Sequence, residues 1–205
     1  MTVTSRERLI KTLNHEEPDR VVVDFGSTSI TGINANALAK LRAALGLEQR
    51  TIKINEPLQL LGMVEDDLLE ALHIDVVDVT NNCNMYGFEN KGWKPWKLKS
   101  GLAVEVPEKF NTTVDEQGNT YLYAQGDMNY PPASVMPKDG YYFDHLERSH
   151  VEFDEDTTGG REDFKDDFGI LTDEHLRYIE DRCNHFYNNT GYGMIGGGAL
   201  AGLGD

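Results

Sequence analysis

The sequence has little cysteine and no long apolar run. Its two cysteines, Cys83 and Cys183, lie far apart, whereas small secreted domains that depend on disulfides carry several. No apolar stretch approaches the roughly 20 residues that a transmembrane helix needs, and the polar N-terminus lacks the apolar segment of a signal peptide. These absences predict a protein of the reducing cytoplasm.

Basic residues are also scarce. The 205 residues include 19 Lys and Arg against 35 Asp and Glu, which gives a formal net charge of −16. Such a surface repels nucleic acid and anionic membranes, so neither is an expected partner. A polyanionic substrate would be held only where basic residues are concentrated locally.

Three short stretches share one pattern, an apolar run that is followed at once by small polar residues or glycines. They cover residues 21–25, 75–79 and 192–195. Continuous apolar runs of this kind are typical of parallel strands that are buried on both faces. Helical patterns separate the runs, and connections of this length imply parallel pairing. The sequence therefore predicts an α/β fold whose three parallel strands direct their C-terminal ends toward one site.

Four helices are predicted from capping residues and from apolar residues at helical spacing. A capping box of Thr4 and Glu7 opens the first, and Thr172 is the expected N-cap of the last. Between them, helical patterns cover about residues 34–45 and 64–72. The apolar stripes expected to be buried are Leu9, Ile10 and Leu13 in the first helix and Leu176, Ile179, Cys183 and Phe186 in the last.

Residues 84–150 break this rhythm and contain both tryptophans and most of the tyrosines and prolines. Phe110–Val114 and Thr120–Tyr123 read as the two strands of a hairpin with a turn at Gly118. An earlier strand near residues 102–106 is expected to pair with this hairpin. We therefore predict an antiparallel insertion after the second parallel strand.

Residues 5–26, which run from Ser-Arg-Glu-Arg to Asp-Phe-Gly, resemble the opening of the uroporphyrinogen decarboxylase superfamily. The likeness is strongest to the branch that includes corrinoid-dependent methyltransferases. Residues 72–79, the hairpin insertion and residues 172–198 continue it over nearly the whole chain. The resemblance implies a (β/α)8 barrel.

Only three barrel strands can be found, so we interpret residues 1–205 as a single partial domain, the N-terminal part of such a barrel. The insertion at about 84–150 and an acidic linker at about 152–168 belong to it. Three strands cannot close a barrel, so an open strand edge and exposed apolar helix faces are expected. The missing C-terminal half, or a second copy of the chain, is the protein partner that this interpretation implies.

Functional side chains of such barrels lie at the C-terminal ends of the strands. On this basis Asp24, after the first strand, and Asn82, after the second, are the candidate catalytic residues. The residues expected to bind the substrate are Phe25, Gly26, Ser27, Thr28, Asn81, Gly197 and Gly198. Local explanations stay open, since Asp24 could accept hydrogen bonds from backbone amides and the glycines could serve packing.

Two departures from the decarboxylases bear on the substrate. Their loop after the first strand carries arginines that pair with substrate carboxylates, whereas residues 26–32 contain none. Asn82 falls near an aspartate that binds pyrrole N–H groups in the decarboxylases, and an amide lacks that negative charge. Both departures favour methyl transfer between a corrinoid and a thiol over decarboxylation of uroporphyrinogen, with a small molecule as the substrate.

The methyltransferase relatives use zinc to activate the thiol as a thiolate. Their His and Cys ligands lie in the later half of the barrel, so no cofactor is expected in this chain, and zinc and a corrinoid only in a complete enzyme. Two alternatives stay open. The chain could be a non-catalytic binding or interaction module that uses the aromatic residues of the insertion, or an inactive truncated fragment.

Overall fold

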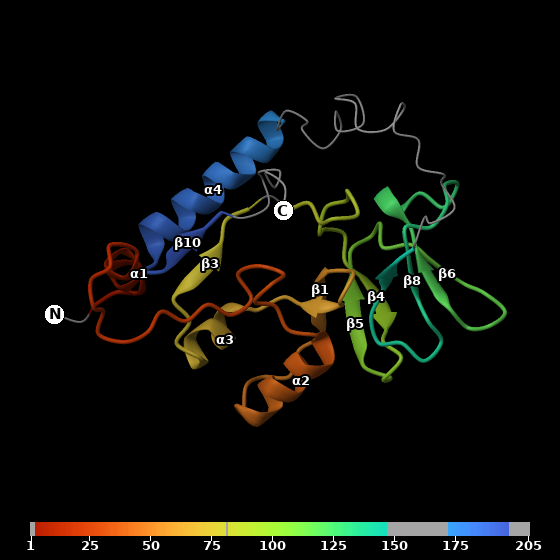
Figure 1. Ribbon diagram of the computed structural model, residues 1–205, viewed down its shortest axis with the longest axis horizontal. Helices are drawn as coiled ribbons and strands as arrows, with labels where there is room; N and C mark the ends of the chain where they lie inside the picture. The colour runs from red at the N-terminus through yellow and green to blue at the C-terminus, as the bar shows by residue number, and fades with distance from the viewer. Residues whose placement is uncertain (1–2, 81, 147–171, 197–205) are drawn as a thin grey trace, which may run out of the picture.

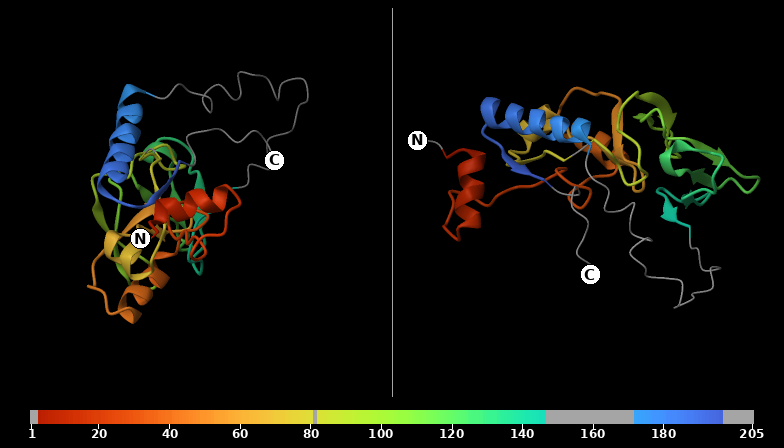
Figure 2. Two further views of the ribbon diagram at one scale, coloured as in Figure 1. Left: turned by 90° about the vertical axis from the view of Figure 1, so that its left-hand side faces the viewer. Right: turned by 90° about the horizontal axis from the view of Figure 1, so that it is seen from above.

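The computed structural model describes residues 3–80, 82–146 and 172–196, and these residues form a mixed fold of helices and strands. They contain four α-helices and three separate β-sheets, and the described part of the chain does not form a closed barrel. Helix α1 and the sheets of the insertion lie at opposite ends of the molecule (Figure 1; Figure 2, right). No helix in the described ranges is long and apolar enough to cross a membrane.

Two of the three predicted parallel strands are confirmed. Strand β3 (Val76–Asp78) pairs in parallel with β10 (Gly193–Ile195), with Val77 opposite Met194. Helix α4 (Asp173–Asn189) leads into β10 and lies across both strands (Figure 1). The C-terminal ends of β3 and β10 therefore point the same way, as the sequence predicts.

The predicted first strand is wrong in two respects, because residues 21–25 form no strand and are not buried on both faces. The Val21 side chain is 80% exposed. The segment does lie beside β3, since the Val23 carbonyl accepts a hydrogen bond from the Asp75 amide over 2.8 Å. The Val23 amide, however, donates to the Asp75 carboxylate over 2.9 Å. The Asp75 side chain thus occupies the Val23 amide, which a neighbouring strand would need for backbone pairing.

The four predicted helices are confirmed. The helices are α1 (Ser5–Leu13), α2 (Ala35–Ala44), α3 (Asp66–Ala71) and α4. Side chains cap the N-termini of three of them, α1, α2 and α4. Thr4 and Glu7 form the capping box of α1, and the Thr172 hydroxyl caps α4.

The apolar stripe predicted for α1 is wrong. Ile10 is 50% exposed and Leu13 is 69% exposed, and the buried side chain of this helix is Arg8. Leu176 on α4 is exposed as well. These apolar side chains are exposed because no described element packs against them. Apolar residues at helical spacing therefore did not predict which side chains of these helices are buried.

A sheet that the sequence did not predict precedes the insertion. Strands β1 (Ile52–Glu56) and β2 (Leu61–Gly62) join β4 (Lys94–Lys97) and β5 (Ala103–Val106) in the order β2-β1-β5-β4. The β1–β5 contact is parallel, and the other two are antiparallel. The strand expected near residues 102–106 therefore exists, but the prediction that it pairs with the hairpin is wrong.

The hairpin itself is confirmed. Strands β6 (Thr112–Val114) and β7 (Thr120–Leu122) are antiparallel, and β8 (Ser134–Met136) and β9 (Asp144–His145) extend this sheet. Gly118 in the turn has a φ of +88°, which L side chains rarely adopt. A 3₁₀ turn at Ala124–Gly126 follows β7. The acidic linker expected at about 152–168 lies outside the described residues.

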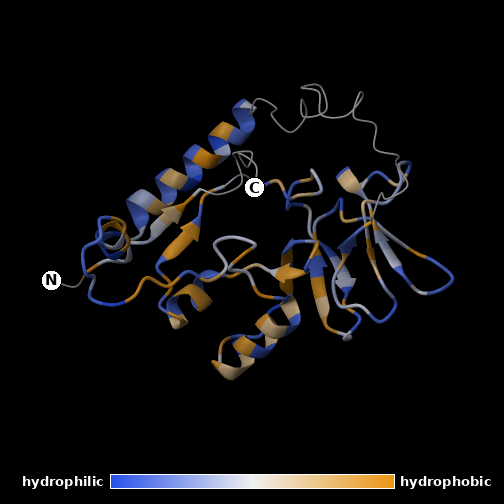
Figure 3. Cartoon of the chain, viewed as in Figure 1, coloured by the Kyte–Doolittle hydropathy of each residue, from blue (hydrophilic) through white to orange (hydrophobic). Residues whose placement is uncertain are grey.

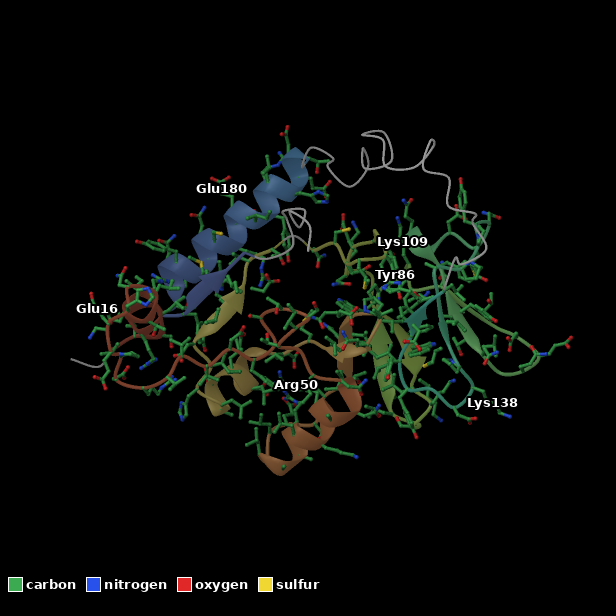
Figure 4. All side chains as sticks on the ribbon, viewed as in Figure 1. Glu16, Arg50, Tyr86, Lys109, Lys138 and Glu180 are labelled. Atoms are coloured by element: carbon green, nitrogen blue, oxygen red, sulfur yellow. The ribbon has the colours of Figure 1, made fainter. Side chains whose placement is uncertain are left out.

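Apolar side chains form two clusters of unequal size. The larger has fifteen buried residues from α2, α3, the two four-stranded sheets and the loops around them. Inside it the hydroxyl of Tyr86, which Figure 4 labels, donates to the Ser134 side chain. The smaller has three, Leu69, Ile74 and Val77, and lies around β3. Figure 3 shows apolar residues concentrated on β3, whereas β5 and α4 alternate between apolar and polar residues. The parallel pair is thus the less thickly covered part of the molecule.

Candidate functional site

A short loop at the end of the 21–25 segment brings several predicted site residues together. The Gly26 amide donates to the Thr31 carbonyl over 2.8 Å and closes the loop. Gly26 has a φ of +82°, and a Cβ added there would lie 2.3 Å from the Val64 side chain. Only glycine fits both the backbone conformation and the close approach of Val64. The glycine therefore fixes where residues 27–31 turn.

Thr31 organises the polar groups of this loop, although the sequence analysis did not single it out. Its hydroxyl donates to the Asp24 carboxylate over 3.3 Å and accepts from the Thr28 amide, also over 3.3 Å. Asp24 is half-buried, and a hydroxyl rather than a backbone amide is its hydrogen-bond partner. A carboxylate held in this way keeps acceptor capacity for a further donor.

Ser27 has the most unusual position in the loop. The residue is 5% exposed, and its hydroxyl has no hydrogen-bond partner among the residues that the structure describes. An unsatisfied buried hydroxyl costs about 1–3 kcal/mol, so such groups are rare in native proteins. Its neighbour Phe25 packs against both apolar clusters. Ser27 thus has an unfilled hydrogen-bonding position, whereas Phe25 contributes to the core.

The second candidate catalytic residue belongs to a different set of contacts. The Asn82 carbonyl accepts from the Asn90 amide over 2.9 Å, and its side-chain amide donates to the Asn90 carbonyl over 3.4 Å. Asn90 in turn donates to the Asn55 carbonyl, which ties this turn to β1. Asn82 is therefore held by the insertion, while Asp24 is held by Thr31. Asn81, Gly197 and Gly198 lie outside the described residues.

A cluster of buried charges lies at the opposite, N-terminal ends of the parallel strands. The Asp75 side chain is fully buried and accepts from Arg8 over 2.6 Å and from Arg20 over 2.6 and 2.8 Å. Arg8 also forms a forked pair with Asp19 over 2.7 and 2.8 Å. Burial raises the pKa of Asp75, but hydrogen bonds from Val23, Ser5 and Arg20 outweigh it and lower the pKa below 3.8. The carboxylate is thus ionised at neutral pH.

An open cavity of about 510 Å³ adjoins this cluster and is lined by α1, Arg20, His73 and Tyr192. It lies at the N-terminal ends of β3 and β10. In barrels, this end of the strands serves stability rather than catalysis. Arg8, Arg20 and Asp75 therefore join α1 to β3. The sequence analysis missed them because the pairs form between distant parts of the chain.

A third group of polar contacts lies at the C-terminal end of β3. Arg182 on α4 donates from Nη2 to the carbonyl of Asp78, the last residue of β3, over 2.7 Å. The Asp78 carboxylate points elsewhere, since it accepts from the Thr80 amide over 2.8 Å and from the Thr80 hydroxyl over 2.7 Å. The guanidinium of Arg182 is thus placed near the end of a parallel strand without a carboxylate partner among the described residues.

The described residues contain no group of three or more His, Cys, Asp and Glu that could hold a metal ion. Cys83 and Cys183 are both half-buried, and burial raises the pKa of the Cys83 thiol, which disfavours the thiolate that zinc binds. The described part of the chain therefore does not fit a zinc centre of its own.

Comparisons with protein-family models, with curated proteins and with solved structures found no match. The arrangement of side chains is therefore the basis for a functional interpretation. The described residues offer a carboxylate and a buried hydroxyl without a described hydrogen-bond partner in the loop after residues 21–25, and a guanidinium on α4 that reaches the end of β3. Such groups can bind and orient a polar small molecule.

Proposed function

We propose that the chain forms the N-terminal part of a uroporphyrinogen decarboxylase-like (β/α)8 barrel and contributes to a cytoplasmic enzyme. The order of the 21–25 segment, β3 and β10 supports this proposal, because β3 lies between the other two and bonds to both. Consecutive parallel segments with helical connections are the repeating unit of such barrels. Exposed apolar side chains on α1 and α4 would be covered by the remaining strands and helices, supplied by a C-terminal half or a second copy of the chain.

For the reaction, we propose that the completed site transfers a methyl group between a corrinoid and a thiol. The observation that carries this choice is the loop at residues 24–32, which is polar and free of arginine and contains the unpaired Ser27 hydroxyl. Uroporphyrinogen carries several carboxylates, which this loop has no cation to bind. Asp24 and Ser27 would bind and orient the small-molecule substrate. No step is assigned to zinc within this chain, because its described residues do not fit a zinc site.

The test is the activity of the protein together with any reading frame that continues or adjoins its gene. The product should convert methylcobalamin and a thiol to the thioether, which the absorbance change of the corrinoid reports. A matched pair of loop variants, Ser27→Ala and Ser29→Ala, should separate the buried hydroxyl from an exposed one, with only the first raising the KM. Turnover of uroporphyrinogen instead would refute the methyl-transfer proposal.

A non-catalytic interaction module is the second candidate, and exposed aromatic residues favour it. Tyr130, Tyr141 and Tyr142 in the insertion are all more than half exposed. Tyrosine is enriched at protein interfaces because it combines apolar area with a hydroxyl group. This alternative predicts that replacing the three tyrosines by alanine abolishes complex formation while the Ser27→Ala variant has no effect.

A further inference from the structure

Arg182 and Arg177, both on α4, use few of their donors, but only Arg182 is partly buried with a buried N–H that has no acceptor among the described residues. In this acidic chain, several arginines form ion pairs with carboxylates: Arg8, Arg20, Arg42 and Arg50. Arg6 donates to four backbone carbonyls at the end of α4 and in the residues that follow it. Arg182 makes one hydrogen bond, to the Asp78 carbonyl, and takes part in no ion pair with a described residue.

The Arg182 side chain is nevertheless held firmly. Its Cζ lies 5.2 Å from the centre of the Phe186 ring and 5.9 Å from that of Tyr178, on the same helix. The hydrogen bond from Nη2 to the Asp78 carbonyl, 2.7 Å long, holds the guanidinium on a third side. The Nε–H is buried and has no acceptor in the described ranges. The guanidinium is therefore pre-positioned, with an N–H group shut off from bulk water.

An unpaired, buried donor on a charged group is unfavourable, and an oxyanion removes that cost because two of its oxygens match the fork of N–H groups on a guanidinium. The acid nearest along β3 does not fill this position, because the Asp78 carboxylate bonds to Thr80. Glu180, on the exposed side of α4, points to solvent (Figure 4).

We propose that Arg182 anchors an oxyanion subsite at the C-terminal end of β3, which takes the carboxylate or phosphate group of a small molecule. This inference rests on the contacts of the Arg182 side chain and does not depend on the proposed methyl transfer. The subsite places a cation on α4, beside the end of β3, whereas the 24–32 loop contains no Lys or Arg.

The test is an NMR titration of the complete 205-residue chain that observes the arginine Nε–Hε signals. Inorganic phosphate and succinate are added separately, with ionic strength held constant by sodium chloride. The Arg182 signal, assigned by its loss in Arg182→Lys, should shift and saturate with at least one anion. Arg182→Lys keeps the charge but loses the fork, so we expect its affinity, read from backbone amide shifts near β3, to fall about tenfold or more.

Arg177→Lys is the matched control, because Arg177 is exposed on the same helix and its Nε donates to the Asp173 carbonyl over 3.1 Å. Its affinity should equal that of the unmodified chain. Saturation with phosphate alone would identify a phosphate ligand, and with succinate alone a carboxylate ligand. An Arg182 signal that stays unmoved by both anions, or equal losses in the two variants, would overturn the proposal and leave Arg182 as a structural link between α4 and β3. The titration of the unmodified chain decides this even if Arg182→Lys fails to fold.

Discussion

The parallel pair β3–β10 and the larger sheets beside it are held together by different contacts. Around the parallel pair, three buried apolar residues form the core, and the buried Asp75 carboxylate joins Arg8 to Arg20. In and around the two four-stranded sheets, fifteen buried residues form one cluster, in which Phe110 packs edge-on against Trp96 and Phe143. Apolar burial supplies most of the stability of a fold. A buried ion pair adds little net stability, but removing one of its partners is strongly destabilising.

Some of the exposed apolar residues lie beside the small core of the parallel pair. Val21, Leu13 and Leu176 are all exposed near the parallel pair, on the segment beside β3, on α1 and on α4. A thin apolar core leaves such faces uncovered, and the charged contacts align α1 and β3 without covering them. The parallel region should therefore be the less stable one and the one that a further layer of protein would stabilise. Four measurements test this comparison.

Truncating the aromatic core should have the largest effect. Phe110→Ala removes a ring that is 2% exposed and contacts two other aromatic rings, so the free energy of unfolding should fall by about 4 kcal/mol. Urea unfolding followed by circular dichroism measures it. Tyr141→Ala, an exposed aromatic in the same region, should cost less than about 0.5 kcal/mol. Equal losses in the two variants would show that the large cluster does not dominate stability.

Neutralising the buried carboxylate should come next. Asp75→Asn leaves the buried Arg8 guanidinium with Asp19 alone and should cost about 3 kcal/mol, because removing one member of a buried ion pair leaves an uncompensated charge. Asp19→Asn is the matched control, since the Asp19 side chain is 42% exposed and Arg8 would keep Asp75. A larger loss in Asp19→Asn than in Asp75→Asn would contradict the assignment of Asp75 as the centre of the cluster.

Local signals predicted the helices of this fold well. The caps at Thr4 and Thr172 depend on neighbouring residues alone, so the sequence placed both helix starts correctly. The strand at residues 21–25 failed because the Asp75 side chain, distant in sequence, bonds the Val23 amide. The predicted partner of β5 was wrong for a similar reason, since its actual partner β1 lies far from it in the chain.

For the site, the sequence analysis found the loop but not its internal contacts. The position of Ser27 after an apolar run marked it as a candidate, yet its burial without a partner became visible only in the structure. Arg182 was missed because nothing in a helical stripe shows that its guanidinium reaches the Asp78 carbonyl. Side-chain reach between distant segments depends on how helices pack, which periodicity does not encode. The catalytic roles of Asp24 and Asn82 stay predictions.

Acid should act on the parallel region first. The pKa of Asp75 in the folded chain lies below the unfolded value of 3.8, so its contribution to stability is present above that value and is lost as the pH falls through the folded pKa. Amide signals of β3 should therefore weaken below about pH 3.8 before those of β5, as a series of NMR spectra between pH 6 and 2 would show. The stability lost in acid should be smaller than the stability that Asp75→Asn loses near neutral pH, because the protonated carboxyl group stays in place. In the Asp75→Asn variant, the difference between β3 and β5 should no longer change with pH, and a persistent acid step there would assign the effect to other carboxylates.

Removing the cap of α4 should have the smallest effect and should be confined to the parallel region. The Thr172 hydroxyl accepts from the His175 amide over 3.2 Å, and Thr172→Ala should cost about 1 kcal/mol because this amide loses its partner. Thr172→Ser keeps the hydroxyl and should be close to neutral. Hydrogen exchange should speed up in α4 and β10 but not in β5, since none of the α4 residues is fully buried and the larger cluster does not include this helix. Equal acceleration in β5 would mean that the two regions unfold as one cooperative unit. The two regions would then differ in their packing but not in their stability.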